Sequence, residues 1–435
     1  MASDKILDRF DAWQENELWP ALAKKFNTHS SGDAASAKAL DLTIDVQSRS
    51  SLLRQETQLG EVTETRLLTS PGAPRKRHIG IRLPTGVEYR AGDYLAVLPM
   101  NPPDLVKRVL GRFGLPWDAM ITIDESNTTS LPKNTPIGAH DVLASMVELE
   151  QPVSSRLAAA VVKSIPDEKE AGILEERLKK AAVSPSLLEI LEDHAQAQFS
   201  FAQFLAAMPP MRMRQYSISS SPLQNPAVVS LTYSVIDAPS KSGGKANFVG
   251  ICTTYMERLK VGDRVHVSLK DSRAGFHLPA DDSTAIIMAC AGTGLAPFRA
   301  FVSERAIKKA NGIDVGPAML FYGCSRPDED DMYREEFDKW EQEGVVSIHR
   351  AYSRKPEESG GAKHVQDRIW EDREEVTALF KKQAQIYLCG AGVVGLGVEK
   401  TMARIRSEMS GEDEEAAQKW VAELKGDRYW SDVFS

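Results

Sequence analysis

The sequence predicts an α+β and α/β protein, in which an antiparallel β-barrel interrupted by a helical insertion precedes a doubly wound parallel sheet. Short strand-like runs bounded by Pro-Gly and Ala-Gly-Asp turns occur on both sides of a long helical stretch. Beyond residue 280, apolar strands alternate with helices, which is typical of a parallel sheet covered on both faces. A chain of 435 residues has room for about three domains.

The first sixty residues predict a terminal helix and a linker. Six apolar residues lie near helical spacing, namely Ile6, Phe10, Trp13, Leu18, Leu22 and Phe26. Polar sequence rich in Ser, Ala and Asp follows from Thr28 to about Gln58. Because a lone helix and a linker cannot form a domain, we expect residues 1–60 to be the end of another domain.

The β-barrel is expected in two segments, 61–111 and 206–280, around a helical insertion at 112–205 that Pro and Asn residues break into short helices. The predicted strands of the first segment are Val62–Leu68, His78–Leu83 and Tyr94–Pro99. Those of the second are Arg214–Ser219, Val228–Ile236, Phe248–Cys252 and Arg264–Leu269.

Residues 281–435 are expected to form the doubly wound domain. Its predicted strands are Ala285–Cys290, Ala318–Gly323, Val345–Tyr352 and Ile386–Cys389, followed by an alternating aromatic strand within Arg428–Ser435. Its predicted helices are Pro297–Lys309, Tyr333–Glu343, Trp370–Lys382 and Glu399–Ser410.

The composition argues against several functional classes. Lys and Arg number 53 against 61 Asp and Glu, so the formal net charge of −8 argues against nucleic-acid binding. No apolar run approaches the ~20 residues that span a bilayer, and the N-terminus lacks the basic and apolar regions of a signal peptide. The cysteines are too scattered for a zinc site or a disulfide framework. We expect a cytoplasmic protein that has no metal centre and does not bind a membrane.

Two segments of the barrel region carry candidate binding chemistry. In Arg214–Ser221, a guanidinium can fork onto a diphosphate, Tyr216 can stack on a flat heterocycle and Ser217 can hydrogen-bond a ring nitrogen. An ordinary edge strand with a serine-rich turn explains this pattern equally well. Gly250 precedes a helix and allows the backbone to approach a phosphate, although glycine is common before helices.

Three segments of the second region lie at the carboxyl ends of predicted strands. Doubly wound sheets bind their ligands at these ends. Gly292-Thr293-Gly294 resembles a phosphate-binding turn, but Pro297 replaces the third glycine of the standard fingerprint, and a turn without a ligand remains an alternative. Ser353 and Arg354, with Lys363 ten residues on, suit a 2′-phosphate, although a solvated basic loop is the simpler interpretation. Cys389 can be merely a small core residue.

Taken together, the segments RQYSIS, GICTTY, AGTGLAPFRAF, FYGCSRPDEDDMYREEF, AYSR and IYLCG resemble the ferredoxin–NADP reductase family over about residues 60–435. They resemble more closely the FAD/NADPH half of diflavin reductases such as NADPH–cytochrome P-450 reductase. The chain is most similar to the reductase part of self-sufficient fusions with a cytochrome P-450. The resemblance implies an FAD-binding barrel, an NADP-binding sheet, and FAD and NADPH as cofactors.

The resemblance also implies site residues. FAD would be held by Arg214, Gln215, Tyr216, Ser217, Thr232, Tyr233, Ser234, Gly250, Ile251, Cys252, Thr253 and Phe434. NADPH would be held by Arg66, Thr293, Ser353, Arg354, Lys363, His364 and Gln366, with Thr293 on the diphosphate. The catalytic residues would be Ser217, Cys389 and Asp432. Phe434 would cover the flavin and swing away for the nicotinamide; the close relatives mostly have Trp there, so discrimination against NADH is expected to be less strict.

The function that the resemblance implies is an NADPH–haemoprotein reductase. It would pass electrons through an FMN-binding flavodoxin-like domain to a haem monooxygenase domain of the same parent polypeptide. Nothing in the chain resembles the FMN domain, and the helix at 7–26 resembles its last helix, so we expect the chain to be an excised piece. The alternatives are a reductase module of the sulfite reductase or nitric oxide synthase type and a flavoprotein-like docking module without catalysis.

Overall fold

The computed structural model describes residues 13–26, 45, 48–127, 129–181, 184–239, 247–272 and 275–434, and the chain divides into two compact units, 1–46 and 47–435. In the first unit, a π-helical turn (Gln14–Leu18) leads into α2 (Trp19–Phe26), within the stretch predicted to be helical. Ile6 and Phe10 of that prediction lie outside the described residues.

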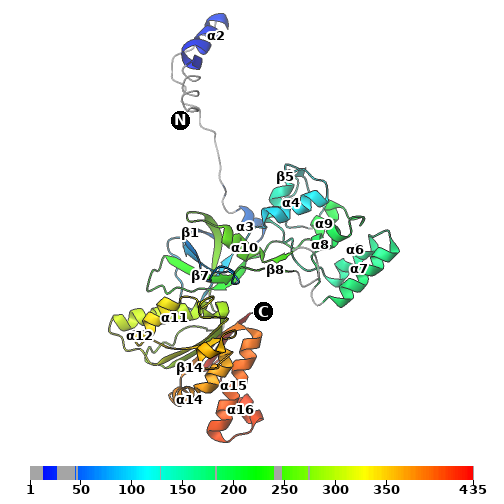
Figure 1. Cartoon of the computed structure of the whole chain (residues 1–435). Helices are drawn as coiled ribbons and strands as arrows, with labels where there is room; N and C mark the ends of the chain where they lie inside the picture. Colours follow the sequence, from blue (N-terminus) through cyan, green and yellow to red (C-terminus); the bar gives the residue numbers. More distant parts are fainter. Residues whose placement is uncertain are drawn as a thin grey trace. The chain divides into compact units, whose positions relative to one another are not determined.

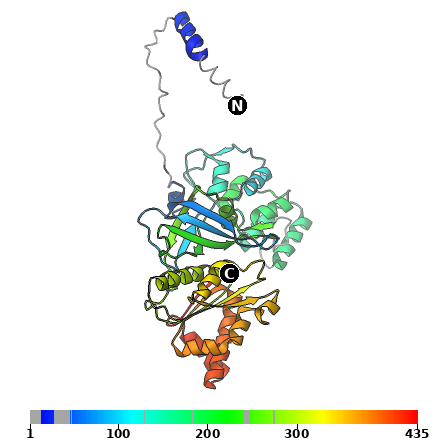
Figure 2. The same cartoon turned by 60° about the vertical axis from the view of Figure 1, so that its left-hand side comes forward.

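The second unit contains the predicted antiparallel barrel. Its strands follow the order β6-β3-β10-β1-β2-β7, and each pairs antiparallel with its neighbour. A further antiparallel bridge, between Ile218 and Leu231, joins the two outer strands. Figure 2 shows the early blue strands beside green strands that follow the insertion. The strands are β1 (Gln58–Leu67), β2 (Lys76–Arg82), β3 (Tyr94–Val97), β6 (Arg214–Ser217), β7 (Val228–Ser234) and β10 (Arg264–Lys270).

The strand predicted at Phe248–Cys252 is wrong in its second half. A small hairpin of β8 (Asp237–Pro239) and β9 (Asn247–Val249) ends before Gly250, and α10 (Ile251–Arg258) begins directly after it. The amide of Thr254 donates to the carbonyl of Gly250 at 2.9 Å, which closes the first helical turn. A short apolar run cannot distinguish a strand from a buried helix, and here both occur in succession.

The linker predicted up to Gln58 is also shorter than expected. A short helix, α3 (Ser48–Leu52), precedes β1, which begins at Gln58. Arg49 anchors α3, because its Nε donates to the carbonyl of Ser145 in the helical insertion at 2.9 Å. This contact joins positions 96 residues apart, so no local pattern could indicate it.

The helical insertion has a core of its own. Buried residues from its helices, including Val106, Leu143, Leu188 and Phe204, form one apolar cluster. The first helix of this cluster begins at Pro103, before the expected boundary at 112. The insertion comprises α4 (Pro103–Arg112), α5 (Ala139–Ser145), α6 (Ser155–Lys163), α7 (Glu168–Lys180), α8 (Leu187–Asp193) and α9 (Phe201–Ala207), with a small hairpin of β4 (Met120–Ile121) and β5 (Ile137–Gly138).

The C-terminal part is a five-stranded parallel sheet in the order β13-β12-β11-β14-β15. Along β11, Met288 packs with one apolar cluster and the neighbouring Ile287 with another, so both faces are buried. Helices α11 (Ala296–Ala310) and α12 (Arg334–Gln342) cover the first face, and α13 to α16 cover the second (Figure 1). The strands are β11 (Ile286–Ala291), β12 (Ala318–Cys324), β13 (Ser347–Tyr352), β14 (Gln385–Ala391) and β15 (Tyr429–Phe434).

Three of the predicted helices differ from the structure, and one further helix was not predicted. The helix predicted at Trp370–Lys382 is two helices, α13 (Val365–Glu371) and α14 (Arg373–Lys381). Helix α12 starts after Tyr333, which has a left-handed φ of 56°. Helix α15 (Gly392–Ser410) begins seven residues earlier than predicted, and α16 (Glu414–Glu423) was not predicted. None of the described helices is both long and apolar enough to cross a membrane.

Candidate active site

Three side chains predicted to act together converge where the barrel meets the parallel sheet. The hydroxyl of Ser217, at the end of β6, donates to Oδ2 of Asp432 on β15 at 3.0 Å. The thiol of Cys389, on β14, lies 3.8 Å from the same carboxylate oxygen. Cys389 and Asp432 stand opposite each other in the β14–β15 register, so the sheet itself fixes this pair.

The electrostatics of this cluster keep its thiol neutral. Burial raises the pKa of Cys389 well above its ordinary value, and the neighbouring Asp432 carboxylate raises it further. The pKa of Tyr94, which faces the same cluster from β3, is also raised, by burial and then by Asp432. Two neighbours of the Asp432 carboxylate, Cys389 and Tyr94, are therefore neutral side chains.

A cavity of about 1260 Å³ adjoins this cluster and takes its walls from both sheets. The barrel contributes Tyr216 and Ser217 at the end of β6 and Tyr233 on β7. The parallel sheet contributes Thr293 and the last residues of β15. A planar ligand in this cavity would contact residues from both sheets at once.

A second cavity, of about 710 Å³, adjoins the first at the start of α10. The two cavities share four residues, Gln215, Tyr216, Ile236 and Thr253. Every residue predicted to hold FAD lines one or both of them, the full set being Arg214, Gln215, Tyr216, Ser217, Thr232, Tyr233, Ser234, Gly250, Ile251, Cys252, Thr253 and Phe434.

The backbone at Gly250 suits the close approach of a diphosphate. A Cβ atom at this position would lie 2.7 Å from Oγ1 of Thr253 and 2.9 Å from Cβ of Ile236, so no larger residue fits. Helix α10 begins at the next residue, and the N–H groups of a first helical turn have no partner within the helix. The second cavity therefore meets a helix N-terminus that can bind an anion.

The sequence suggested that the Arg214 guanidinium is available to a ligand, but in the structure it is already paired within the protein. Its guanidinium donates to both carboxylate oxygens of Glu148, at 2.8 and 2.7 Å. The side chain of Glu148 is only 1% exposed, and it also accepts the backbone N–H of Arg212 at 3.0 Å. The guanidinium also donates to the carbonyl of Arg212 at 3.0 Å, so the helical insertion and the adjoining backbone together orient Arg214 at the wall of the second cavity.

The turn after β11 separates the first cavity from a smaller one of about 260 Å³. Thr293 lines the first cavity, and its neighbour Gly292 lines the smaller one. Gly292 has a φ of +55°, and a Cβ at Gly294 would lie 2.3 Å from the carbonyl oxygen of Cys389. This turn therefore needs both glycines, which agrees with the predicted phosphate-binding turn.

The smaller cavity holds most of the residues predicted to bind NADPH. Ser353, Lys363, His364 and Gln366 all line it. Arg354 is not part of its lining; the residue is exposed, and its guanidinium contacts no partner within the part of the chain that the structure describes. A ligand reaching from this cavity over the Gly292–Thr293 turn would enter the first cavity.

Arg66 lies apart from these cavities. Its guanidinium pairs with Glu64 at 3.3 Å and with Glu336 of α12 at 3.0 Å, and it lies 5.3 Å from the ring centre of Tyr333. Arg66, which was predicted to bind NADPH, therefore lines none of the three cavities described here. All four cysteines are free and buried, and no group of three metal-binding side chains occurs among the described residues.

Sequence reasoning missed three residues around the site, Glu148, Lys76 and Tyr333. Glu148 and Arg214 are 66 residues apart. Tyr333 bonds Thr232 through its hydroxyl at 2.6 Å, across 101 residues. Lys76 lines the smaller cavity although it belongs to a barrel strand. The acidic run around Tyr333 marked this segment in the sequence. Nothing in the sequence indicated that Thr232 is the partner of Tyr333.

Comparison with known proteins identifies the two domains. Residues 52–255 match the family described as FAD binding domain, and residues 288–395 match the family described as oxidoreductase NAD-binding domain. The chain is an FAD- and NAD-binding oxidoreductase. This assignment and the two sheets confirm the predicted ferredoxin–NADP reductase-like fold and the predicted FAD and NAD(P)H cofactors.

The reductase is also similar to curated fusion proteins. A bifunctional cytochrome P450/NADPH–P450 reductase of Fusarium oxysporum is 41% identical over 447 residues, 100% of this chain and 41% of the relative. A protein of the same description from Acremonium egyptiacum is 41% identical over 438 residues, and covers 99% of this chain and 41% of the relative. A self-sufficient cytochrome P450 monooxygenase of Phanerodontia chrysosporium is 42% identical over 444 residues, 99% of this chain and 41% of the relative. The reductase thus spans about two fifths of these relatives, and the predicted resemblance to P450–reductase fusions is confirmed.

Proposed function

We propose that the chain is an NADPH-dependent FAD reductase whose electrons pass, through an FMN-binding flavodoxin-like domain, to a haem monooxygenase domain. The observation that carries the reaction is the convergence of Ser217, Cys389 and Asp432 beside a cavity that both domains line; Ser217 and Asp432 form part of its wall, and Cys389 contacts Asp432 from behind them. The names of the fusion relatives support the haem partner, and their length beyond the matched part leaves room for further domains.

The residues present fit FAD. The first cavity offers Tyr216 as a flat apolar wall, and the second offers the α10 N-terminus and the guanidinium of Arg214 for a diphosphate. The exclusion of a side chain at Gly250 supports close backbone contact there. When it is bound, FAD supplies the redox chemistry: it accepts a hydride and then passes on the two electrons one at a time.

The protein's own residues orient the reactants and stabilise charge. The nicotinamide ring becomes positive as it loses a hydride, so a fixed carboxylate at Asp432 stabilises that ring as the charge develops. Ser217 orients the carboxylate by donating to it at 3.0 Å. The neutral thiol of Cys389 occupies the space beside it without adding a competing charge. Phe434, 44% exposed at the end of β15, covers the cavity and must move for the nicotinamide to enter.

The lining of the smaller cavity favours binding of NADPH over NADH. Ser353 and Lys363 can bind a dianionic 2′-phosphate there, and no carboxylate other than Asp330 lines this cavity. Asp330 is paired with Lys76 at 2.8 Å, so it offers little to a ribose hydroxyl. Arg354, which directly follows Ser353 in the sequence, is exposed and adds a further cation next to this lining residue.

The proposal is tested by the colour and reduction of the purified protein. It should be yellow, should release FAD and no FMN on extraction, and should bleach on addition of NADPH without oxygen. It should then reduce ferricyanide but transfer electrons to a haem protein poorly unless an FMN domain is added. A colourless protein that does not take up added FAD contradicts the proposal, and faster reduction by NADH than by NADPH contradicts the 2′-phosphate assignment.

A further inference from the structure

Tyr333 belongs to the NAD-binding domain, but its hydroxyl lies in the barrel. The residue directly precedes α12 and is only 7% exposed. Its hydroxyl is 2.6 Å from the hydroxyl of Thr232 on β7 and 3.0 Å from Nδ1 of His78 on β2. Thr232 and His78 stand opposite each other in the β2–β7 register. Because Thr232 also lines the first cavity, this contact joins the two domains at the cavity wall.

Two guanidinium groups hold the ring of Tyr333. That of Arg299, on α11, lies 4.5 Å from the ring centre, and that of Arg66, on β1, lies 5.3 Å from it. A cation within about 6 Å of a ring centre is attracted to the aromatic face. Arg299 is itself fixed, since it donates to the carbonyl of Ser219 in the barrel and to Glu336 of α12, each at 2.8 Å. Both domains therefore contribute to the placement of this ring.

The backbone of Tyr333 is strained. Its φ of 56° and ψ of 28° lie in the left-handed region, which residues other than glycine rarely adopt. Such a conformation persists only where the surrounding structure over-determines it, and it is concentrated at functional sites. The contacts of the ring and of the hydroxyl with the barrel offset the cost of this conformation.

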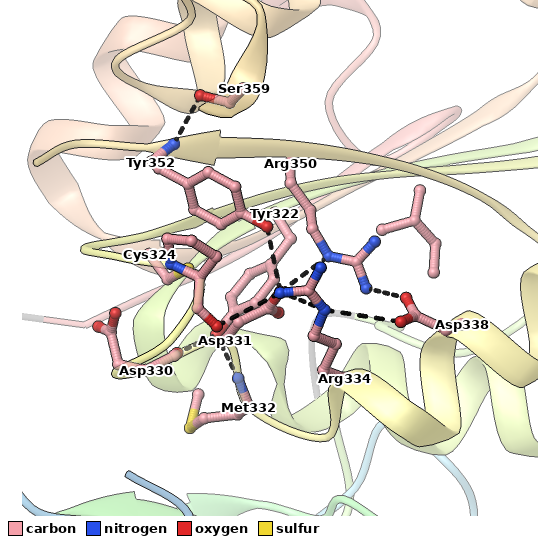
Figure 3. Close-up of polar contacts among 12 residues, drawn as sticks. Tyr322, Cys324, Asp330, Asp331, Met332, Arg334, Asp338, Arg350, Tyr352 and Ser359 are labelled. Atoms are coloured by element: carbon pink, nitrogen blue, oxygen red, sulfur yellow. Dashed lines mark hydrogen bonds and ion pairs between the residues drawn. The ribbon is translucent and has the colours of Figure 1, made fainter. Parts of the chain in front are cut away.

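The segment that leads to Tyr333 is anchored in the NAD-binding domain. The side chain of Asp331 is only 1% exposed, pairs with Nε of Arg350 on β13 at 3.0 Å and accepts the hydroxyl of Tyr352 at 3.2 Å. Figure 3 shows Asp331 among Arg334, Arg350 and Tyr352. The segment is thus tied to the parallel sheet, and Tyr333 connects the position of that sheet to the barrel.

The barrel holds the other domain at two separate points. Ser217 donates to Asp432 on β15, and the neighbouring strand β7 bonds Tyr333 through Thr232. Tyr333 follows β12, and β12 and β15 lie on opposite sides of β11 in the sheet order. A single hydrogen bond would let the two domains pivot about it. Two bonds on opposite sides of β11 fix their relative orientation.

We propose that Tyr333 is a positioning residue for hydride transfer, whose bond to Thr232 fixes the distance and angle between the nicotinamide-binding and flavin-binding walls of the first cavity. This inference rests on the proposed function. Tyr333 lines none of the three cavities, so it acts through Thr232 and the domain interface, not on the reactants. Reacting atoms must come within about 3–3.5 Å, and a misplacement of about 1 Å can slow a reaction about a hundredfold.

The test is anaerobic stopped-flow reduction of the FAD-loaded chain by saturating NADPH. Tyr333→Phe removes only the hydroxyl and keeps the ring between its two cations. Its limiting reduction rate should fall about tenfold, with FAD content and NADP⁺ affinity equal to those of wild type. The long-wavelength charge-transfer absorbance, which requires contact between the nicotinamide and flavin rings, should weaken in the same variant. An unchanged limiting rate would overturn the inference.

Tyr89→Phe is the matched control. Tyr89 is also a buried tyrosine, and its hydroxyl lies 3.0 Å from both Oγ of Ser220 and the carbonyl of Val228, all within the barrel. The two tyrosine variants should lose similar unfolding free energy in urea, but Tyr89→Phe should keep the wild-type reduction rate and charge-transfer absorbance. Equal slowing in both would show that loss of any buried hydroxyl slows reduction, and would overturn the positioning role.

The same bond can be removed from the barrel side. Thr232→Val should slow reduction as much as Tyr333→Phe, and Thr232→Ser, which keeps the hydroxyl, should recover most of the wild-type rate. Because both changes remove one bond, the double variant Tyr333→Phe/Thr232→Val should be no slower than either single variant. All rates are measured on FAD-loaded protein. Multiplied losses, about a hundredfold in the double variant, would overturn the inference.

The outcomes also distinguish this inference from the proposed function. If NADPH does not reduce the wild-type protein, the proposed function fails and the inference fails with it. If NADPH reduces wild type and Tyr333→Phe at the same limiting rate, only the inference is overturned.

Discussion

The hydroxyl of Ser217 and the carboxylate of Asp432 are 3.0 Å apart, although they are separated by 215 residues and belong to different sheets. One residue ends an edge strand of the barrel, and the other lies on the last strand of the parallel sheet. This hydrogen bond ties the two domains together beside the cavity where the proposed reaction occurs. A change in either sheet's register would remove it.

Cys389→Ala should slow reduction by NADPH about tenfold and leave the affinity for NADP⁺ nearly unchanged, since the thiol contacts Asp432 and not the phosphate-binding turn. The measurement is anaerobic stopped-flow reduction with a parallel binding titration. Cys290→Ala is the matched control, because Cys290 is an equally buried cysteine opposite Cys389 in the next strand and lies in none of the cavities described above. A large loss of NADP⁺ binding in Cys389→Ala would contradict the assigned role.

Phe434→Ala should raise the use of NADH markedly relative to NADPH. Removal of the ring uncovers the cavity, so nicotinamide entry would depend less on binding energy from the 2′-phosphate. The measurement is the ratio of kcat/KM for the two nucleotides in ferricyanide reduction. Phe434→Trp keeps a flat ring and should keep the preference for NADPH. Unchanged selectivity in Phe434→Ala would show that Phe434 does not control entry of the nicotinamide.

Glu148→Gln should weaken FAD binding about tenfold, because the amide cannot hold the Arg214 guanidinium with two charged hydrogen bonds. The measurement is the FAD dissociation constant from flavin fluorescence. Glu412→Gln is the control, since Glu412 forms a similar two-bond pair with Arg406 in the other domain, at 3.0 and 2.6 Å. Equal FAD affinity in Glu148→Gln and in wild type would show that this pair does not position Arg214 for FAD.

Acidification should destabilise the protein through His78. Burial, and then the cations of Arg299 and Arg66, lower the pKa of His78 to about 3. Tyr333 also faces the ring, with its hydroxyl 3.0 Å from Nδ1, while Glu64 at 3.8 Å from Nε2 is half exposed and screened by water. A histidine with a depressed pKa contributes stability above its unfolded pKa of about 6.5, and this contribution is lost as the pH falls toward 3.

The expected size of this effect is about 2 kcal/mol of unfolding free energy lost between pH 7 and pH 5. The measurement is urea unfolding of wild type and of His78→Gln at both pH values. The wild-type protein should lose about 2 kcal/mol more than the variant over this interval. Equal losses in the two proteins would show that His78 is not kept neutral by the fold.

The grouping of Cys389 with Asp432 and the set of residues expected to hold FAD both came from the family resemblance. In the structure, the β14–β15 register places Cys389 and Asp432 opposite each other. Strand β6 and the start of α10 are continuous segments, so each brings several of the residues expected at FAD to one place.

Other features depended on contacts that no local pattern shows. The predicted helix began only after Gly395 and Gly397, whereas α15 begins at Gly392. In the structure they are helical residues required by packing: a Cβ at Gly397 would lie 3.0 Å from Cδ of Gln366, and one at Gly395 would lie 3.2 Å from Cδ2 of Leu388. Lys76 could not be predicted to lie near Gly292, because that contact depends on how the two domains pack.

The central claim is that the cluster of Ser217, Cys389 and Asp432 carries hydride transfer, and the reduction rate of Asp432→Asn tests it most directly. FAD-loaded wild type and Asp432→Asn are each mixed with excess NADPH without oxygen, and the flavin absorbance is followed. Wild type should bleach rapidly and Asp432→Asn about a hundredfold more slowly, with equal FAD content and equal NADP⁺ affinity in the two proteins. Equal rates in the two proteins would contradict the claim.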